Sequence, residues 1–212
     1  MRFAAAFGVC VFLVACAGGP PAPDWKVNSL ASLRSFEAAY LGGSSRAAEV
    51  DFARARSDLA ATGRADLVAR AELVRCAARV ASLEFDTCPG FTALAADAGA
   101  PERAYATFLS GDWKALDAAA LPAQHRSVVA GAGGDLPEEP FARLVAAGAL
   151  MRAGRITPAQ IAAAVDVASA NGWRRPLLAW LGVQAKRAEA AGDNEATARI
   201  RRRIELVTGG GK

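Results

Sequence analysis

The sequence predicts an all-α fold. Ala, Leu, Arg and Glu dominate the chain, and all four are good helix formers, whereas β-branched residues are scattered. No stretch alternates apolar and polar residues for long enough to predict a strand. Because 53% of the 212 residues are hydrophobic, the chain can build a core, which excludes a disordered protein. The length favours a single domain.

The predicted helices follow one another with short connections. Their ranges are 28–41, 46–62, 65–84, 91–98, 101–110, 113–120, 123–131, 139–153, 158–170, 174–191 and 194–207. Thr157 is a good N-cap, Pro158 suits the first helical position, and Gln160 completes a capping box. The last helix carries an apolar stripe at helical spacing, formed by Ala196, Ile200, Ile204 and Val207.

Three turns share the pattern Gly-[Ser/Asp]-x-x-Ala and begin at Gly43, Gly111 and Gly192. In each turn the Gly can end one helix in the left-handed conformation, and the Ser or Asp can cap the next. In the predicted helix after the first turn, Ala48, Phe52 and Ala55 have the residue spacing of the second helix of a tetratricopeptide repeat. The predicted helix before the last turn matches the signature positions of the first helix of that repeat with Leu178, Leu181, Gly182 and Ala185.

These residues resemble tetratricopeptide repeats, and the resemblance implies an array of antiparallel helical hairpins, an α-solenoid. Gly43 and Gly111 are 68 positions apart, twice the usual period of about 34 residues. Gly192 follows after 81 positions and breaks the regular count, and the hairpins lack the closing Pro of that repeat. An irregular helical bundle is therefore the alternative.

The N-terminus has the features of a signal peptide. Arg2 supplies a positive charge, and residues 3–14 form an uncharged apolar run that is too short to span a membrane. The tetrapeptide Leu13-Val14-Ala15-Cys16 resembles the lipobox of bacterial lipoproteins. The resemblance implies a signal peptide over 1–15, lipid on Cys16, a Gly/Pro-rich tether over 16–27 and one all-α domain over 28–212. An ordinary secretory signal, with Cys16 incidental, is the alternative.

The same resemblance implies a location. Ala17 and Gly18 stand where some lipoproteins carry an Asp retention signal, which favours the outer membrane and a domain that faces the periplasm. The acyl chains of a lipidated Cys16 would hold the protein stably on the bilayer. The whole chain resembles the uncharacterised proteobacterial lipoproteins.

Two cysteines, Cys76 and Cys88, remain in the expected mature domain. In an oxidising periplasm they could form a disulfide that closes a short loop. Their spacing matches neither a CxxC redox pair nor a zinc ligand set, so no metal is expected. The alternative is a pair of buried free thiols.

Catalytic motifs are missing from the sequence. No GxSxG, HExxH, Walker A, GxGxxG or EF-hand pattern occurs, and we expect neither an enzyme nor a cofactor. His125 is the sole histidine, and we interpret it as a surface or structural residue. It could otherwise act as a general base near Ser127 or Asp117. Glu138 and Glu139 indicate an acidic helix start rather than an acid/base pair.

Positive charge is concentrated at the C-terminal end. Residues 172–212 hold nine Lys or Arg and four Asp or Glu, a net charge of +5, whereas residues 17–171 have a net charge of −2. A possible basic surface is formed by Arg199, Arg201, Arg202 and Arg203. It could face anionic lipid, lipopolysaccharide or an acidic partner, or it could simply be a solvated helix face. Nucleic acid is not an expected partner, because the lipobox places the domain outside the cytoplasm.

Two functional hypotheses follow. The leading one is a lipid-anchored, non-catalytic interaction or scaffold module that binds another envelope protein. The alternative is an envelope enzyme or small-ligand binder with its site near His125.

Overall fold

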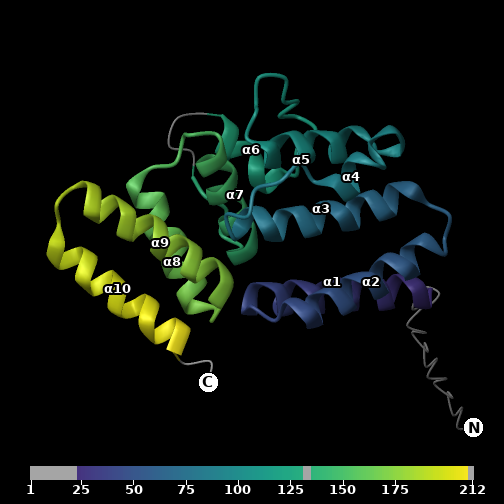
Figure 1. Cartoon of the computed structure of the whole chain (residues 1–212). Coiled ribbons are helices and arrows are strands. Elements are labelled where there is room, and N and C mark those ends of the chain that lie inside the picture. The colour runs from purple at the N-terminus through teal and green to yellow at the C-terminus, as the bar shows by residue number, and fades with distance from the viewer. Residues whose placement is uncertain (1–22, 131–134, 210–212) are drawn as a thin grey trace, which may run out of the picture.

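A computed structural model describes residues 23–130 and 135–209, and throughout these residues the fold is all-α (Figure 1). The lipobox with Cys16, the signal peptide and most of the tether lie outside the described residues. Ten α-helices and one short 3₁₀ helix, η1, are present in the described ranges. Their bounds are α1 Asp24–Gly42, α2 Ser45–Ala60, α3 Ala65–Ala81, α4 Pro89–Thr92, η1 Ala95–Asp97, α5 Ala100–Ser110, α6 Ala123–Val129, α7 Pro140–Arg152, α8 Pro158–Ala170, α9 Arg174–Ala190 and α10 Asn194–Gly209.

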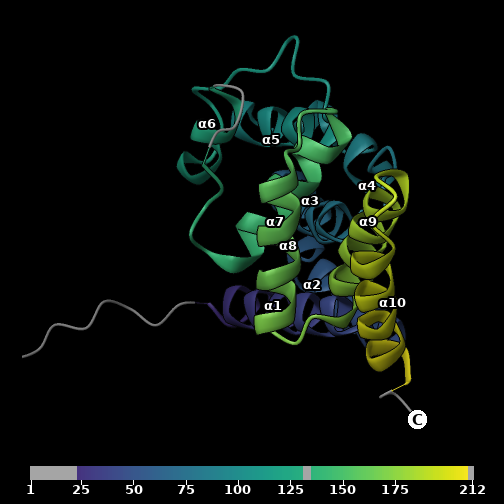
Figure 2. The same ribbon diagram turned by 90° about the vertical axis from the view of Figure 1, so that its left-hand side faces the viewer.

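Neighbouring helices pack in pairs around the central helix α3. The helix α3 contacts α1 and α2 on one side and α5 and α7 on the other, while α8, α9 and α10 continue the arrangement beyond α7 (Figures 1 and 2). The helix α1 also contacts α9, which lies more than 130 residues further along the chain. None of the described helices combines the length and the apolar character needed to cross a bilayer.

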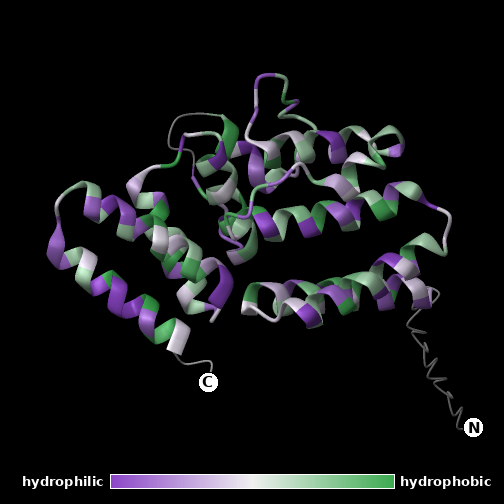
Figure 3. Ribbon diagram, in the orientation of Figure 1, coloured by the Kyte–Doolittle hydropathy of each residue, from purple (hydrophilic) through white to green (hydrophobic). Residues whose placement is uncertain are grey.

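The apolar residues gather into two buried clusters, and hydrophobic and hydrophilic residues alternate along the helices that supply them (Figure 3). The larger cluster joins α3, α5, α7, α8 and α9 and includes Phe108, Leu144 and Trp180. The smaller one joins α1, α2 and α3 around Phe36 and Phe52. Ile200, Ile204 and Val207, from the predicted stripe of α10, pack against the larger cluster and stay partly exposed.

Helices α3 and α7 approach each other closely because small residues line their contact. Ala77 on α3 and Ala147 on α7 are both buried in the larger apolar cluster. A Cβ atom added at Gly148 would lie 2.8 Å from the carbonyl carbon of Val80 and closer still to its oxygen. Glycine at position 148 therefore sets the distance between the two helices. Gly182, in the middle of α9, has no such neighbour within 4 Å.

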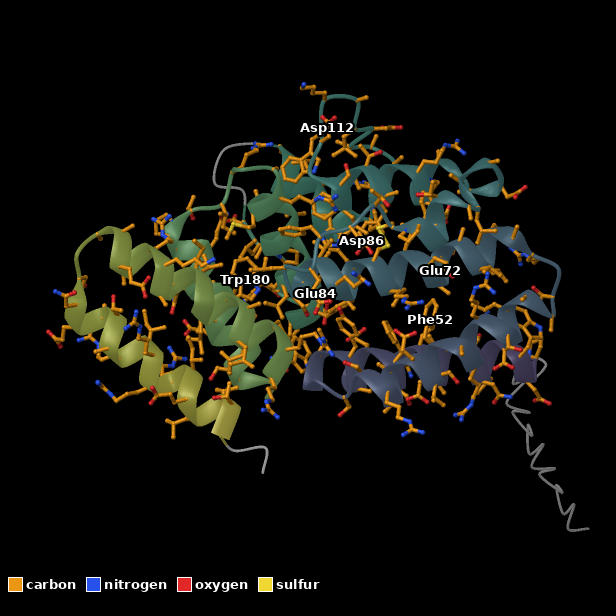
Figure 4. The ribbon with its side chains drawn as sticks, in the orientation of Figure 1. Phe52, Glu72, Glu84, Asp86, Asp112 and Trp180 are labelled. Carbon is orange, nitrogen blue, oxygen red and sulfur yellow. A yellow bond between two sulfur atoms is a disulfide. The ribbon has the colours of Figure 1, made fainter. Side chains whose placement is uncertain are left out.

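Two side chains of α9 connect it to the other half of the molecule. The Trp180 indole is fully buried and donates a hydrogen bond of 3.0 Å to the carbonyl oxygen of Ala81, at the end of α3 (Figure 4). The Arg175 guanidinium donates to the Tyr40 carbonyl oxygen at 2.7 Å and pairs with the Glu84 carboxylate at 3.1 Å. Arg175, one of the basic residues in the positively charged C-terminal region, is therefore engaged in tertiary contacts.

Several local predictions are confirmed. Thr157 and Gln160 form the capping box of α8, and the Glu139 carboxylate caps α7 by accepting the N–H groups of Phe141 and Ala142. The turn glycines adopt positive φ: Gly43, Gly111 and Gly192. Asp193 accepts the N–H of Ala196 at the start of α10, whereas the Ser44 side chain makes no capping hydrogen bond.

Two predicted helices are wrong. Residues 113–120 form turns, because the Asp117 carboxylate binds the N–H groups of Ala119 and Ala120 and so competes with helical hydrogen bonds. The indole of Trp113 donates to the Phe108 carbonyl oxygen instead of starting a helix. The predicted helix 91–98 is divided between α4 and η1, since the Leu94 N–H bonds to the carbonyl oxygen of Phe91, only three residues back.

Candidate functional site

A hollow of about 500 Å³ lies between α8, α9 and α10, and we call it the arginine groove. Pro158 and Ile161 from α8 and Ile200 from α10 supply its apolar lining. Arg187 comes from the last turn of α9, and Arg199 and Arg203 come from consecutive turns of α10. Apolar contact area and positive charge therefore occur together in one concave surface.

The charges in the arginine groove are only partly neutralised. Arg199 pairs with Glu195 of its own helix. Within the described residues, neither Arg187 nor Arg203 has an ion-pair partner. Two guanidinium groups in the groove are thus available to an anionic group.

The predicted basic surface is divided by the fold. Arg199 and Arg203 line the arginine groove, whereas Arg201 bonds to the Glu189 carboxylate at 2.8 Å. Arg202 lines a separate hollow beside Leu206, whose side chain is strongly exposed. Successive residues of a helix point in different directions, so four arginines within five positions do not share one face.

A second hollow, of about 380 Å³, lies between α3 and α5, and we call it the Tyr105 pocket. Leu73, Val74 and Tyr105 make it largely apolar. At its edge, the Arg70 guanidinium pairs with the Glu102 carboxylate at 2.6 Å. The pocket has the apolar lining and the few polar groups typical of a small-ligand site.

His125 contacts Tyr105, one of the residues that line this pocket. Its ring stacks on those of Tyr105 and Phe108, with centroid distances of 5.5 and 4.8 Å, and its exposed fraction is 1%. Burial lowers its pKa to about 4, so the imidazole is neutral at pH 7. Among the residues that the structure describes, none forms a hydrogen bond with its Nδ1 atom. His125 is therefore a buried residue of the aromatic cluster, in agreement with the structural interpretation.

The sequence-based alternative for His125 required Ser127 or Asp117 beside it. The Ser127 hydroxyl instead donates to the carbonyl oxygen of Asp135, and the Asp117 carboxylate accepts backbone N–H groups of its own turn. Neither residue forms a hydrogen bond with the imidazole in the described part of the chain.

Two carboxylates influence the electrostatics of this region. Burial raises the pKa of Glu37 to about 7, and repulsion from Glu139 adds to the increase. The pKa of the Tyr105 hydroxyl is raised as well, mainly by burial and then by the charges of Glu37 and Glu139. Shifted pKa values next to a hollow are common at functional sites. No sequence pattern relates Glu37 to Tyr105, because they come from separate helices.

Cys76 and Cys88 form a disulfide, which confirms the predicted pairing. Cys76 lies in α3, and Cys88 precedes the first residue of α4. The Asp86 carboxylate lies beside the two sulfur atoms (Figure 4). Sequence reasoning considered the cysteines alone and missed Asp86, although the Asp-x-Cys pattern is visible in the sequence.

No protein-family model, no curated protein and no solved structure matches this chain.

Proposed function

We propose that this chain is a non-catalytic interaction module of a bacterial envelope, anchored to the outer membrane through lipid on Cys16 and facing the periplasm. Its partner is an envelope protein that presents an acidic segment to the arginine groove. The arginine groove is the observation that carries this proposal. The finer architecture that we propose is a short array of tetratricopeptide-like hairpins, in which α9, the Gly192 turn and α10 form the last hairpin.

The chemistry of the groove favours a carboxylate-bearing peptide. Arginine binds carboxylates through two parallel hydrogen bonds, and Arg187 and Arg203 have no ion-pair partner in the described chain. Ile161 and Ile200 offer apolar contacts between the charged groups. A segment that alternates acidic and apolar side chains satisfies both parts of the lining. A lipid headgroup satisfies only the charges.

Site-specific photo-crosslinking in intact cells tests this proposal. A photo-reactive amino acid at Gln184, which lines the groove, is compared with one at Val50, an exposed residue of α2. We expect a protein adduct at Gln184 but not at Val50, and a Cys16→Ser chain should lose it through mislocalisation. Mass spectrometry of the adduct should identify an acidic segment.

Two triple variants distinguish binding in the arginine groove from a general effect of positive charge. The triple variant Arg187→Gln/Arg199→Gln/Arg203→Gln should abolish the adduct. The control Arg34→Gln/Arg46→Gln/Arg202→Gln removes the same charge from exposed positions outside the groove and should retain the adduct. An adduct that survives the groove triple, or one that contains only lipid, would overturn the proposal.

The Tyr105 pocket favours small-ligand binding as a second candidate function. Tyr105, which lines this pocket, stacks on His125, near which the alternative hypothesis places a site. In a strain in which deletion of the gene causes a defect, a pocket-filling Val74→Trp variant should reproduce that defect if the pocket binds the required ligand. Full function of this variant, with an intact fold, would argue against the candidate.

A further inference from the structure

The environment of the disulfide contains more than two cysteines. One sulfur from each cysteine and one carboxylate oxygen of Asp86 all lie within 4.8 Å of one another. Across residues 23–130 and 135–209, this is the single group of three such side chains close enough to share a metal ion. The ligand atoms come from α3 and from the connection between α3 and α4, which is fixed to the rest of the molecule.

We propose that reduction of the Cys76–Cys88 disulfide opens a zinc-binding site formed by two thiolates and the Asp86 carboxylate. Zinc prefers thiolate sulfur, imidazole nitrogen and carboxylate oxygen in tetrahedral geometry, and three protein ligands leave a fourth position for water. The Cα atoms of the cysteines are 5.7 Å apart. Two thiolates on one zinc ion are separated by about 3.8 Å, given Zn–S bonds of about 2.3 Å. Side-chain rotation at this backbone spacing therefore suffices to accommodate the ion.

The backbone that carries these ligands is held by contacts that do not involve the disulfide. Arg152, from α7, donates a hydrogen bond of 2.8 Å to the carbonyl oxygen of Asp86. Two residues earlier, the Glu84 carboxylate accepts hydrogen bonds from Tyr40 and Arg175. These contacts keep the connection between α3 and α4 in place when the sulfur–sulfur bond is broken. The site is thus organised before the metal binds.

Asp86 itself is oriented by two further groups. The N–H of Cys88 donates to its Oδ1 atom at 2.9 Å, and the Arg79 guanidinium pairs with its Oδ2 atom at 3.1 Å. Groups of this kind orient metal-binding side chains and tune their affinity. Arg79 also balances the charge: three anionic ligands, one Zn²⁺ ion and one guanidinium sum to zero. The oxidised state is equally balanced, because Asp86 then pairs with Arg79 alone.

Access to the site comes from the side of Cys88. A hollow of about 370 Å³ is lined by Asp86 and Cys88 together with the hydroxyl-bearing residues Thr92, Thr107 and Ser110. Through this hollow a dithiol reductant and then the metal ion reach the sulfur atoms. Both cysteines are buried, and Cys88 alone of the two lines this hollow.

A dithiol acts as the reductant of the protein disulfide. The protein disulfide takes two electrons and two protons from the dithiol, whose own sulfur atoms become joined in a disulfide. The bond between Cys76 and Cys88 is broken in this exchange, and two thiols form. One Zn²⁺ ion then displaces the two thiol protons, which are released to solvent.

Cobalt titration of the full chain in detergent tests the proposal. All samples carry Cys10→Ser and Cys16→Ser, so Cys76 and Cys88 are the remaining thiols. After reduction and anaerobic removal of the reductant, we expect one Co²⁺ per chain, with a thiolate-to-cobalt charge-transfer band and the visible bands of tetrahedral cobalt. Zinc should displace the cobalt and bleach these bands, and the oxidised chain should show none.

Variants assign the ligands. Asp86→Asn should weaken binding at least about tenfold, whereas Asp97→Asn, an exposed residue of η1, should not change it. Cys76→Ser should remove most of the charge-transfer intensity. Zinc should also raise the melting temperature of the reduced chain. The proposal is overturned if the reduced chain loses its helical circular dichroism, shows no bands, or binds cobalt equally well with Asn at position 86.

Discussion

The contact between α3 and α7 permits a sharp test of the packing, because two glycines in helix interiors differ only in their neighbours. We expect Gly148→Ala to destabilise the protein and Gly182→Ala to stabilise it. Alanine is the better helix former, by about 0.5–1 kcal/mol relative to glycine, and this gain applies at both positions. At Gly182 nothing lies within 4 Å of the new methyl group, so the gain remains.

At Gly148 the methyl group would lie 2.8 Å from the carbonyl carbon of Val80, about 0.7 Å closer than a comfortable carbon–carbon contact of about 3.5 Å. The obstacle is backbone of α3 and cannot rotate away, so the helices must separate. Overpacking of this kind costs about 3 kcal/mol at the upper end of its usual range. After the helix-propensity gain of up to about 1 kcal/mol, Gly148→Ala should lower the free energy of unfolding by about 2 kcal/mol.

Thermal denaturation followed by circular dichroism measures both effects. For a domain of this size, 1 kcal/mol corresponds to about 2–4 °C in melting temperature. Gly148→Ala should therefore melt about 4–8 °C below the parent, and Gly182→Ala about 1–4 °C above it. Equal melting temperatures for the two variants would refute the close packing of α7 on α3.

Three further predictions concern the disulfide and the titration of buried groups. The double variant Cys76→Ser/Cys88→Ser should lose about 3 kcal/mol of stability, because the disulfide closes a loop between residues 12 positions apart. A melting temperature equal to that of the parent would contradict this prediction. Glu37 binds its proton more tightly in the folded than in the unfolded chain, since its pKa rises from 4.5 to about 7. The free energy of unfolding should therefore fall as pH increases through this interval, and urea titrations of Glu37→Gln should show that fall removed. His125 gives the free energy of unfolding the opposite pH dependence. Its pKa falls from 6.5 to about 4 in the folded chain, so the free energy of unfolding decreases as pH decreases between these values. Urea titrations of His125→Phe should lack this acid-dependent loss, and an unchanged pH profile would show that the imidazole is not buried in solution.

The features predictable from the sequence are those that depend on neighbouring residues. The capping box at Thr157, the acidic start at Glu139 and the left-handed Gly192 follow from local hydrogen bonding and backbone sterics, and all three are present. The helix expected over 113–120 failed because helix propensity favours an Ala-rich stretch, whereas Asp117 and Trp113 use its hydrogen-bonding groups in turns.

The candidate sites were harder to predict because their residues come from separate helices. Helical spacing places Arg199 and Arg203 on one face of α10, but nothing in the sequence places Ile161 of α8 opposite them. The same applies to Glu37 and Tyr105, whose electrostatic interaction arises only when α1 and α5 both pack against α3. The disulfide was predictable because the chain offers few cysteines, whereas the role of Asp86 depends on how the connection between α3 and α4 is held.

The junction at Arg175 has a mechanical consequence. In an open array of hairpins, force applied to the first helix is transmitted through every hairpin before it reaches the last one. Here the C-terminal end of α1 is attached directly to α9 through the Tyr40 carbonyl oxygen and the face of the Tyr40 ring, which lies 4.2 Å from the guanidinium carbon. Tension applied at residue 23 is therefore transmitted to α9 and α10 by a short path that bypasses α2 to α8. If the chain is tethered at its N-terminal end, part of the applied force therefore reaches α9 and α10, which carry most of the arginine groove, directly from α1.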